Sequence, residues 1–438
     1  MMRSMYSAVS GLRAHQNKMD VIGNNIANVN TVGYKKGQMT FQEVFSQTIR
    51  GAGAPQGGKG GTNPQQVGLG VDVGSINTIH TNGPSQRTDD PRNVMIDGEG
   101  FFVVTDDANF ENRYYTRAGN FGEDTDGTLV TPGGYKVLGY KADENGNITT
   151  EIGPIVINKS ETIAPTATTD IQFRGNLDSR SDETFTINTV IKDSLGGSWI
   201  VEFKFEKDPN ETNQWTISLE DIKSEKTGIK IEGKITGKNT IKFDEYGKID
   251  ENSVENLYLD LSGITQGEDK DGNKVDLGAT FGNEGNITIF DPEDKDSYKK
   301  INQYDNDRDI EPYPKNGNSS GKLKDFSIDE FGVIVGNFTN GENKALGQLM
   351  LAKFDNPMGL EKVGSNFFKN TRNTGEAQYG AAGTSGFGTT KSGNLEMSNV
   401  DLSMEFTEMI TTQRGFQANS RIITASDEML QELVNMKR

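Results

Sequence analysis

The chain has 438 residues, with 45 basic and 63 acidic side chains and a formal net charge of −18. So acidic a chain is poorly suited to holding nucleic acid through its phosphates, and we predict no nucleic-acid partner. Cysteine is absent and histidine occurs only at His15 and His80. This composition excludes disulfides, zinc–thiolate sites, iron–sulfur clusters and a cysteine nucleophile.

No stretch approaches the roughly 18–20 consecutive apolar residues of a transmembrane helix. The N-terminal residues MMRSMYSAVSGLRAHQNKMD are polar every few positions and lack the apolar middle of a cleavable secretory signal. We therefore expect no membrane insertion. The protein is expected to be either cytosolic or exported with its N-terminus intact.

The N-terminal segment is predicted to form a helix over residues 4–28. Its large apolar residues recur every seven positions, the spacing of a coiled-coil seam, and Ala8, His15 and Ile22 follow three residues behind. Asn-rich residues 23–31 should end the helix, because Asn adopts left-handed backbone readily. The polymerisation seam predicted on this helix consists of Met5, Leu12, Met19, Ile22 and Ile26.

A longer helix is predicted over residues 398–437, starting with a capping box at Ser398 and Asp401. Adjacent apolar residues such as Ile422 and Ile423 point ~100° apart, so the helix has two apolar flanks and needs at least two neighbours. A core helix of one globular domain is the alternative. The polymerisation seam predicted here consists of Leu402, Met409, Phe416, Ile423 and Leu430.

The balance of free energies favours assembly. Ordering one residue costs ~1–2 kcal/mol of backbone entropy, whereas fully burying a Leu, Met or Phe returns ~1.5–3 kcal/mol. Only about one residue in three of the terminal helices is large and apolar, and a single helix pair leaves half of those in water. We therefore expect both ends to become ordered when many copies assemble.

The central part of the chain is predicted to form β-strands, because Val, Ile, Phe and Tyr alternate with polar residues between closely spaced turns. A type I turn pattern, with Asp first and Gly fourth, recurs at 124–127, 143–146, 244–247 and 329–332. The calcium-like run from Asp269 has Lys274 where a calcium loop needs Gly, so we expect no calcium site there.

The predicted fold class is mainly β, with an outer β-domain inserted into an inner one and terminal α-helices pairing as a coiled coil. Gly-rich stretches and Pro-rich boundaries suggest the divisions. We expect the helical ends at 1–50 and 394–438, a Gly-rich connector at 51–70, an inner β-domain at 71–164 plus 321–386, an outer inserted β-domain at 165–320, and a C-terminal connector and helix at 387–438.

Charge is spread unevenly along the chain. Residues 1–50 carry a net charge of +4, residues 394–438 carry −3, and the part between them carries −19. An acidic, solvated coat would discourage polymers from sticking together sideways, although generic solubility explains the charge equally well.

The sequence contains no complete catalytic motif. The stretch from Gly53 to Lys59 mimics a phosphate-binding loop, but Gly60 stands where Ser or Thr should bind magnesium. His15 lies on the helix seam, where a packed imidazole is expected rather than a general base. Nothing marks any pair of the many carboxylates for glycoside hydrolysis. We predict no enzyme activity, no cofactor and no metal ion.

Several strings resemble the flagellar rod and hook protein family. They are the N-terminal SMYSAVSGLRAHQNKMDVIGNNIANVNTVGYKK (4–36) and the C-terminal GNLEMSNVDLSMEFTEMITTQRGFQANSRIITASDEMLQELVNMKR (393–438). NPQQVGLGV (63–71), IDGEGFFVV (96–104) and YTRAGNFGEDTDGTLVTPGGYKVLGY (115–140) resemble the family's inner β-domain. GNLDS (175–179) and KDSLGGSW (192–199) resemble the outer domain of its hook members, whereas residues 200–320 match no motif.

The resemblance implies a helical homopolymer, a hollow tube with the terminal helices lining its channel. A hook member acts as a flexible universal joint that carries torque from rod to filament. The resemblance further implies an extracellular location in the flagellar hook or basal body, reached through the flagellar type III export apparatus without cleavage. Other implied partners are the distal rod protein, the hook cap and the hook–filament junction proteins.

Two alternatives remain open from the sequence. A distal rod subunit of the same family would be straight and rigid, and the insert of roughly 150 residues argues against it. An extracellular adhesin-like β-protein would share the composition but would not need seven-residue repeats at both ends.

Overall fold

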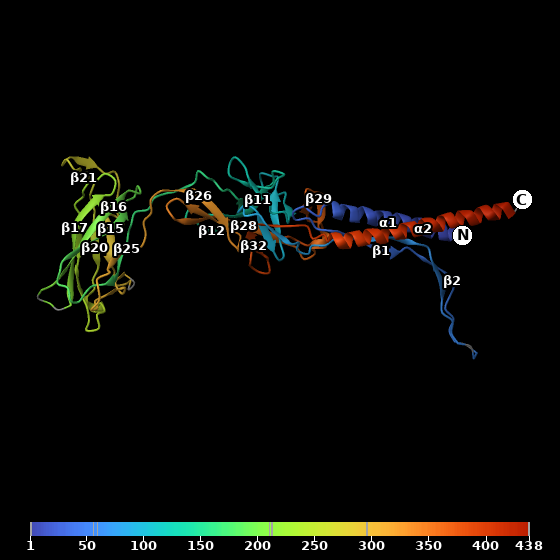
Figure 1. The fold of residues 1–438 in the computed structure, drawn as a ribbon, viewed down its shortest axis with the longest axis horizontal. Coiled ribbons are helices and arrows are strands. Elements are labelled where there is room, and N and C mark those ends of the chain that lie inside the picture. Colours follow the sequence, from blue (N-terminus) through green and yellow to red (C-terminus); the bar gives the residue numbers. More distant parts are fainter. Residues whose placement is uncertain are drawn as a thin grey trace. The chain divides into compact units, whose positions relative to one another are not determined.

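The computed structural model describes residues 2–55, 57–58, 60–209, 211, 213–294 and 297–436. The chain divides into two compact units, and the second is inserted into the first. Unit 1 comprises Met1–Asn158, Phe326–Gly336 and Lys344–Arg438, and unit 2 comprises Lys159–Asp325 and Asn337–Asn343. As predicted, the fold is mainly β, and the N- and C-terminal helices pair (Figure 1). The five-part division of the chain stays a prediction.

Unit 1 joins the helix pair to an antiparallel β-domain. Its central sheet runs in the order β28-β11-β7-β8-β30-β29, with β12 on β11 and β31 on β28. The helices are α1 (Met2–Ala27) and α2 (Leu402–Met436). The strands are β1 (Gly37–Glu43), β2 (Ser46–Arg50), β3 (Gln65–Gly68), β4 (Val71–Thr78), β5 (Ser85–Arg87), β6 (Val94–Asp97), β7 (Phe101–Thr105), β8 (Tyr114–Thr116), β9 (Gly122–Glu123), β10 (Leu129–Val130), β11 (Lys136–Ala142), β12 (Ile148–Pro154), β28 (Asn343–Lys353), β29 (Glu361–Gly364), β30 (Phe367–Lys369), β31 (Gln378–Ala381), β32 (Thr389–Ser392) and β33 (Asn394–Glu396).

The two ends of the chain meet in unit 1 through strand pairing as well as through the helices. Strand β33, just before α2, pairs with β5, and β32 pairs with β6. Strand β1, shortly after α1, pairs with β4. The core of this β-domain is aromatic, with Phe101, Tyr115, Phe354 and Phe368 all buried.

The Gly-rich stretch 51–70, predicted as a connector, contains a strand. Strands β2 and β3 pair as an antiparallel ribbon, and Gly53 and Thr62 form a bridge beyond it. The ribbon projects beside the helix pair (Figure 1). Two residues beside or within it, Phe45 and Ile49, are exposed.

Unit 2 is built around one large core to which several sheets contribute. One sheet has the order β15-β16-β17-β19, another β18-β20-β23 and a third β24-β14-β25. The elements are β13 (Thr162–Ile163), β14 (Ile171–Asn176), β15 (Phe185–Lys192), β16 (Ser198–Lys207), β17 (Gln214–Ser224), β18 (Lys234–Gly237), β19 (Thr240–Lys242), the 3-10 helix η1 (Glu251–Ser253), β20 (Leu257–Asp260), β21 (Gln266–Glu268), β22 (Lys274–Asp276), β23 (Asn286–Phe290), β24 (Ile301–Asn302) and β25 (Glu311–Pro314).

Buried and more exposed residues alternate along β16, which shows how the sequence specifies this core. Every second residue of the strand is buried over most of its length, as expected for a strand with one face on a core. Phe203 and Phe205 of β16 pack edge-on against Phe173 of β14, with ring centroids 5.4 Å apart in both pairs. Strands β26 (Gly321–Ile328) and β27 (Val333–Phe338) carry the chain between the units.

The four predicted Asp-x-x-Gly turns are confirmed. In each, the Gly amide donates to the carbonyl of the Asp three residues before it, at 2.9–3.1 Å. Each Gly has a φ of 73–82°, a region that favours glycine. In three of the turns the Asp carboxylate also accepts a hydrogen bond from the amide two residues on. The same short sequence thus makes the same turn in both units.

We expect Phe173→Ala to destabilise unit 2 by about 3–5 kcal/mol, because it removes a buried ring from a close-packed aromatic cluster. Both tryptophans of the chain, Trp199 and Trp215, are buried in this core. Tryptophan fluorescence during urea unfolding therefore reports on unit 2. The control Tyr246→Ala removes a side chain that is 79% exposed and should leave the midpoint nearly unchanged. Equal midpoints for the two variants would contradict the assigned core.

Candidate functional site: the helix pair and its junction

Helices α1 and α2 run antiparallel and approach each other closely. Near one end of the contact the amide of Asn25 donates to the Glu405 carboxylate at 3.1 Å. Further along, a Cβ added at Gly11 would stand 2.6 Å from Nδ2 of Asn419, and one at Gly415 would stand 2.7 Å from the ring of His15. Glycine on both helices thus permits the approach.

Apart from Ile22, the contact between the helices is made of small and polar side chains. In α2 the buried residues Glu405, Thr412 and Ser426 fall on one line, spaced by seven and fourteen residues. This line faces α1, where Ala8, Ala14, Ile22 and Asn25 are buried. We call these seven residues and the two glycines the inner seam.

The predicted polymerisation seam lies beside the inner seam rather than in it, with the exception of Ile22. In α1, Ile22 is buried and the other four predicted residues are half-buried. In α2, Met409, Ile423 and Leu430 are half-buried, while Leu402 and Phe416 are 39% and 36% exposed. The sequence pattern favoured large apolar residues and missed the polar line of α2. Glu405, Thr412, Asn419 and Ser426 are seven residues apart, and this polar repeat could have predicted the line that faces α1.

Two apolar flanks of α2 border the inner seam. Successive helical residues are rotated by about 100°, which places these flanks about 50–90° to either side of the seam line. We call them flank A (Leu402, Met409 and Phe416) and flank B (Met404, Ile422 and Met429). Five of these six residues are at least 36% exposed, and Met409 is half-buried.

A mostly polar stripe occupies the side of α2 that faces away from α1. Helical rotation places Ser403, Arg414, Gln417 and Arg421 about 150–190° from the seam line. All four are exposed. Ile410, which is 58% exposed, interrupts the stripe.

A buried ion network joins the helix pair to the β-domain of unit 1. Lys35 Nζ lies 2.6 Å from Oε1 of Glu396, and Arg117 Nη1 lies 3.3 Å from Oε2 of the same carboxylate. The side chains are 0%, 4% and 0% exposed for Lys35, Arg117 and Glu396. Lys35 also donates to the Thr81 carbonyl at 2.7 Å. We call these three charged residues the junction network.

One carboxylate does not fully compensate for two buried cations. Burial lowers the pKa of Lys35, and the Glu396 carboxylate opposes only part of that shift. Burial likewise lowers the pKa of Arg117, again with Glu396 as the main opposing influence. The network carries one more positive than negative group.

Asparagine side chains fix the chain on either side of this network. Asn25 donates to the Gly37 carbonyl and accepts from the Gly37 amide, both at 2.9 Å. Asn399 accepts from the Lys36 amide and donates to the Ile79 carbonyl, both at 2.8 Å. These bonds determine where the chain leaves α1 and enters α2.

The start of α2 differs from the predicted one. The Asp401 carboxylate accepts hydrogen bonds from the amides of Ser403 and Met404, so Asp401 caps the helix. Ser398, predicted as the cap, is buried before the helix begins. The predicted capping box was wrong because the chain between Ser398 and Asp401 is held by Asn399.

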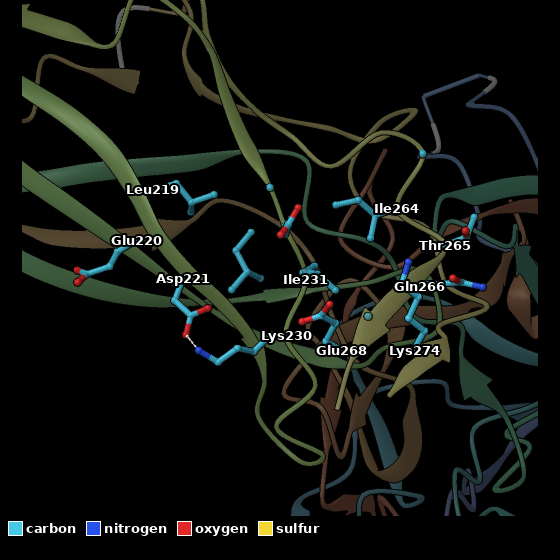
Figure 2. Close-up of a pocket in the computed structure, with 15 residues that line it drawn as sticks. Leu219, Glu220, Asp221, Lys230, Ile231, Ile264, Thr265, Gln266, Glu268 and Lys274 are labelled. Carbon is cyan, nitrogen blue, oxygen red and sulfur yellow. Dashed lines mark hydrogen bonds and ion pairs between the residues drawn. The ribbon is translucent and has the colours of Figure 1, made fainter. Parts of the chain in front are cut away.

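Unit 2 contains an open cleft of about 860 Å³ between β17 and the β21–β22 hairpin (Figure 2). Its lining mixes acidic, basic and apolar side chains, and Asp221 pairs with Lys230 at 2.8 Å. No histidine lines it. The cleft is open and presents these charged side chains to solvent.

Among the residues described, no cluster of three or more His, Asp or Glu side chains is placed to hold a metal ion. Within the same residues, neither helix combines the length and the apolar character that crossing a membrane demands.

Comparisons with known proteins match the chain to flagellar axial proteins along its length. Residues 5–35 match the family model "Flagella basal body rod protein", 95–177 "Flagellar hook protein FlgE/F/G D1 domain", and 391–436 "Flagellar basal body rod FlgEFG protein C-terminal". The chain is 37% identical to the flagellar hook protein FlgE of Borreliella burgdorferi and 36% identical to that of Treponema pallidum, each over the full length of both chains.

A rod protein is also similar. The chain is 31% identical to the flagellar basal-body rod protein FlgG of Bacillus subtilis over the full length of both chains. A solved structure of the Helicobacter pylori flagellar hook protein FlgE2 aligns with 70% of this chain and 99% of that one, at 15% identity and a TM-score of 0.49.

We expect Gly11→Leu to separate the helices, because its side chain would occupy the position of Asn419. The matched control is Gly23→Leu in the same helix, where an added Cβ meets nothing within 4 Å. Hydrogen exchange of α1 amides should accelerate at least tenfold in Gly11→Leu relative to Gly23→Leu, roughly the effect of 1.4 kcal/mol. Similar exchange in both variants would contradict the close helix pairing.

We expect Glu396→Gln to destabilise unit 1 by about 3–5 kcal/mol, since it leaves Lys35 and Arg117 buried without a counter-charge. Lys35→Met should cost less, because Arg117 and Glu396 remain as a neutral pair. Calorimetry should show a lower melting temperature for Glu396→Gln than for Lys35→Met. The reverse order would show that the network is not short of negative charge.

Proposed function

Since the chain belongs to the flagellar hook protein family, we propose that it polymerises through α1 and α2 into a hollow, flexible tube that transmits torque from rod to filament. The single observation that carries this proposal is the exposure of both apolar flanks of α2. Within one molecule, α1 and α2 bury the inner seam between them. Flanks A and B stay exposed and can contact other copies of the chain.

The energetics support assembly through these flanks. Burying an exposed Leu, Met, Ile or Phe side chain contributes ~1.5–3 kcal/mol, so two flanks supply a substantial driving force per subunit. Exposed apolar surface of this extent is uncommon on a protein that stays monomeric. The polar stripe opposite α1 suits the water-filled channel of the tube.

The partners and route follow the family. We infer that the chain passes unfolded and uncleaved through the flagellar type III export apparatus and assembles outside the cell. It would contact the distal rod protein, the hook cap and the hook–filament junction proteins at the two ends of the polymer. We infer a structural role without catalysis.

A distal rod subunit is the second candidate, favoured by the 31% identity to the Bacillus subtilis rod protein. The higher identities to two hook proteins favour the hook. Electron microscopy of purified polymer separates the two. Short, curved tubes support the hook proposal, straight rods support the rod, and dispersed particles contradict both.

We expect Phe416→Asp on flank A to abolish polymerisation, because the carboxylate would be buried against a neighbouring copy without a partner. Leu402→Asp should do the same. Gln417→Asp adds the same charge one residue away on the polar stripe and serves as the matched control. Sedimentation should recover polymer from the wild type and Gln417→Asp only. Polymer from Phe416→Asp at wild-type yield would exclude flank A from the contact.

A further inference from the structure

A cavity of about 320 Å³ lies in unit 1 beside the junction network. Its lining includes His80, Phe101, Arg117, Lys353 and Phe354. The cavity is separate from the inner seam and from both flanks of α2. It is of a size to hold a small molecule or one side chain with water.

Three polar atoms of residues that line this cavity make no hydrogen bond of good geometry within the described part of the chain. They are Nε of Arg117 and both ring nitrogens of His80, all of them buried. The Arg117 side chain is only 4% exposed. Buried polar atoms without partners cost free energy, so a group that accepts hydrogen bonds from the Nε–H of Arg117 and the single N–H of a neutral His80 ring would stabilise the site.

The charge around His80 is positive. Burial and the nearby cations Lys35, Arg117 and Lys362 lower the pKa of His80 to about 4, and the Pro357 carbonyl beside the ring opposes part of that shift. The ring is therefore neutral at pH 7, with one N–H to donate.

The two acidic residues that line the cavity, Glu99 and Asp355, have other partners. Glu99 is 71% exposed and lies 2.6 Å from Lys353. Asp355 accepts a hydrogen bond from Gln378 at 3.1 Å. Neither is among the hydrogen-bond partners of Arg117, which include Glu396 and the carbonyls of Ile96 and Gly98. From the surface, Glu99 raises the pKa of Arg117 less than Glu396 does, so it offsets only part of the excess positive charge of the junction network.

We propose that this cavity binds one carboxylate, which accepts hydrogen bonds from Arg117 and His80 and neutralises the junction network. The carboxylate comes either from a small free acid or from an Asp or Glu side chain of a second copy of this chain. Phe101 and Phe354 give the carbon end of such a group an apolar wall. The nitrogens are covered in the free chain, so the carboxylate enters with a rotation of the His80 ring.

The test uses the two histidines of the full-length chain. With carbon-13-labelled histidine, NMR gives one signal each for His80 and His15, and His15, whose ring lies next to Gly415 of α2, is the internal control. Sodium acetate is the probe, titrated at constant ionic strength against sodium chloride. We expect a saturable change at His80, a rise of its pKa by ~1 unit, and no comparable change at His15.

The substitution Arg117→Gln should abolish the acetate response, and it leaves Lys35 and Glu396 as a balanced buried pair. Arg92→Gln, at an arginine paired with Asp90 on the surface, should leave the response intact. Should Arg117→Gln fail to fold, the wild-type titration decides the question by itself.

The source of the carboxylate is distinguished by comparing free chain and polymer. Acetate mimics both sources, so a response in the free chain supports the site and the polymer assigns the source. A polymer whose His80 signal still responds to acetate assigns a small free acid. A His80 signal that shifts on polymerisation and no longer responds to acetate, and that does not shift in Arg117→Gln polymer, assigns the second copy. An unchanged His80 signal in both experiments overturns the proposal without affecting the proposed function.

Discussion

The close antiparallel contact between α1 and α2 is the constraint from which the exposed apolar flanks of α2 follow. Glycine at positions 11 and 415 lets the helices approach, and the contact is filled by small and polar groups such as Thr412 and Ser426. Apart from Ile22, the large apolar side chains of the predicted seam lie beside this contact or on the flanks. The helix pair thus covers its own contact but leaves two apolar flanks exposed, which a lone molecule in water tolerates poorly. Copies of the same chain can cover both flanks at once.

The junction network ties this helix pair to the folded β-domain. Lys35 follows α1, Glu396 precedes α2, and Arg117 comes from the β-domain between them in sequence. Burying three charges is unfavourable compared with an apolar cluster of the same size, and such networks are kept where they fix a geometry. Here the geometry is the direction in which both chain ends leave the β-domain. A subunit that transmits torque needs that direction to be defined.

The sequence by itself determined the features that depend on neighbours along the chain. Seven-residue repeats placed both terminal helices, alternation gave the β-class, and Asp-x-x-Gly turns were correct in both units because a turn closes within four residues. Long signatures at the ends also indicated the family. The strand β3 inside the Gly-rich stretch was not anticipated, since pairing with β2 across a loop leaves little local signal.

The tertiary structure decided which faces of the helices meet. Periodicity identifies an apolar stripe but does not say what covers it, and hydrophobicity alone placed Leu402 and Phe416 at the centre of a seam. The actual centre is polar and small because backbone separation, set by glycines from opposite ends of the chain, limits the side chains that fit. Patterns between neighbouring residues do not predict the junction network either. Its members are separated by 82 and 279 positions, and only folding brings their charges within hydrogen-bond distance.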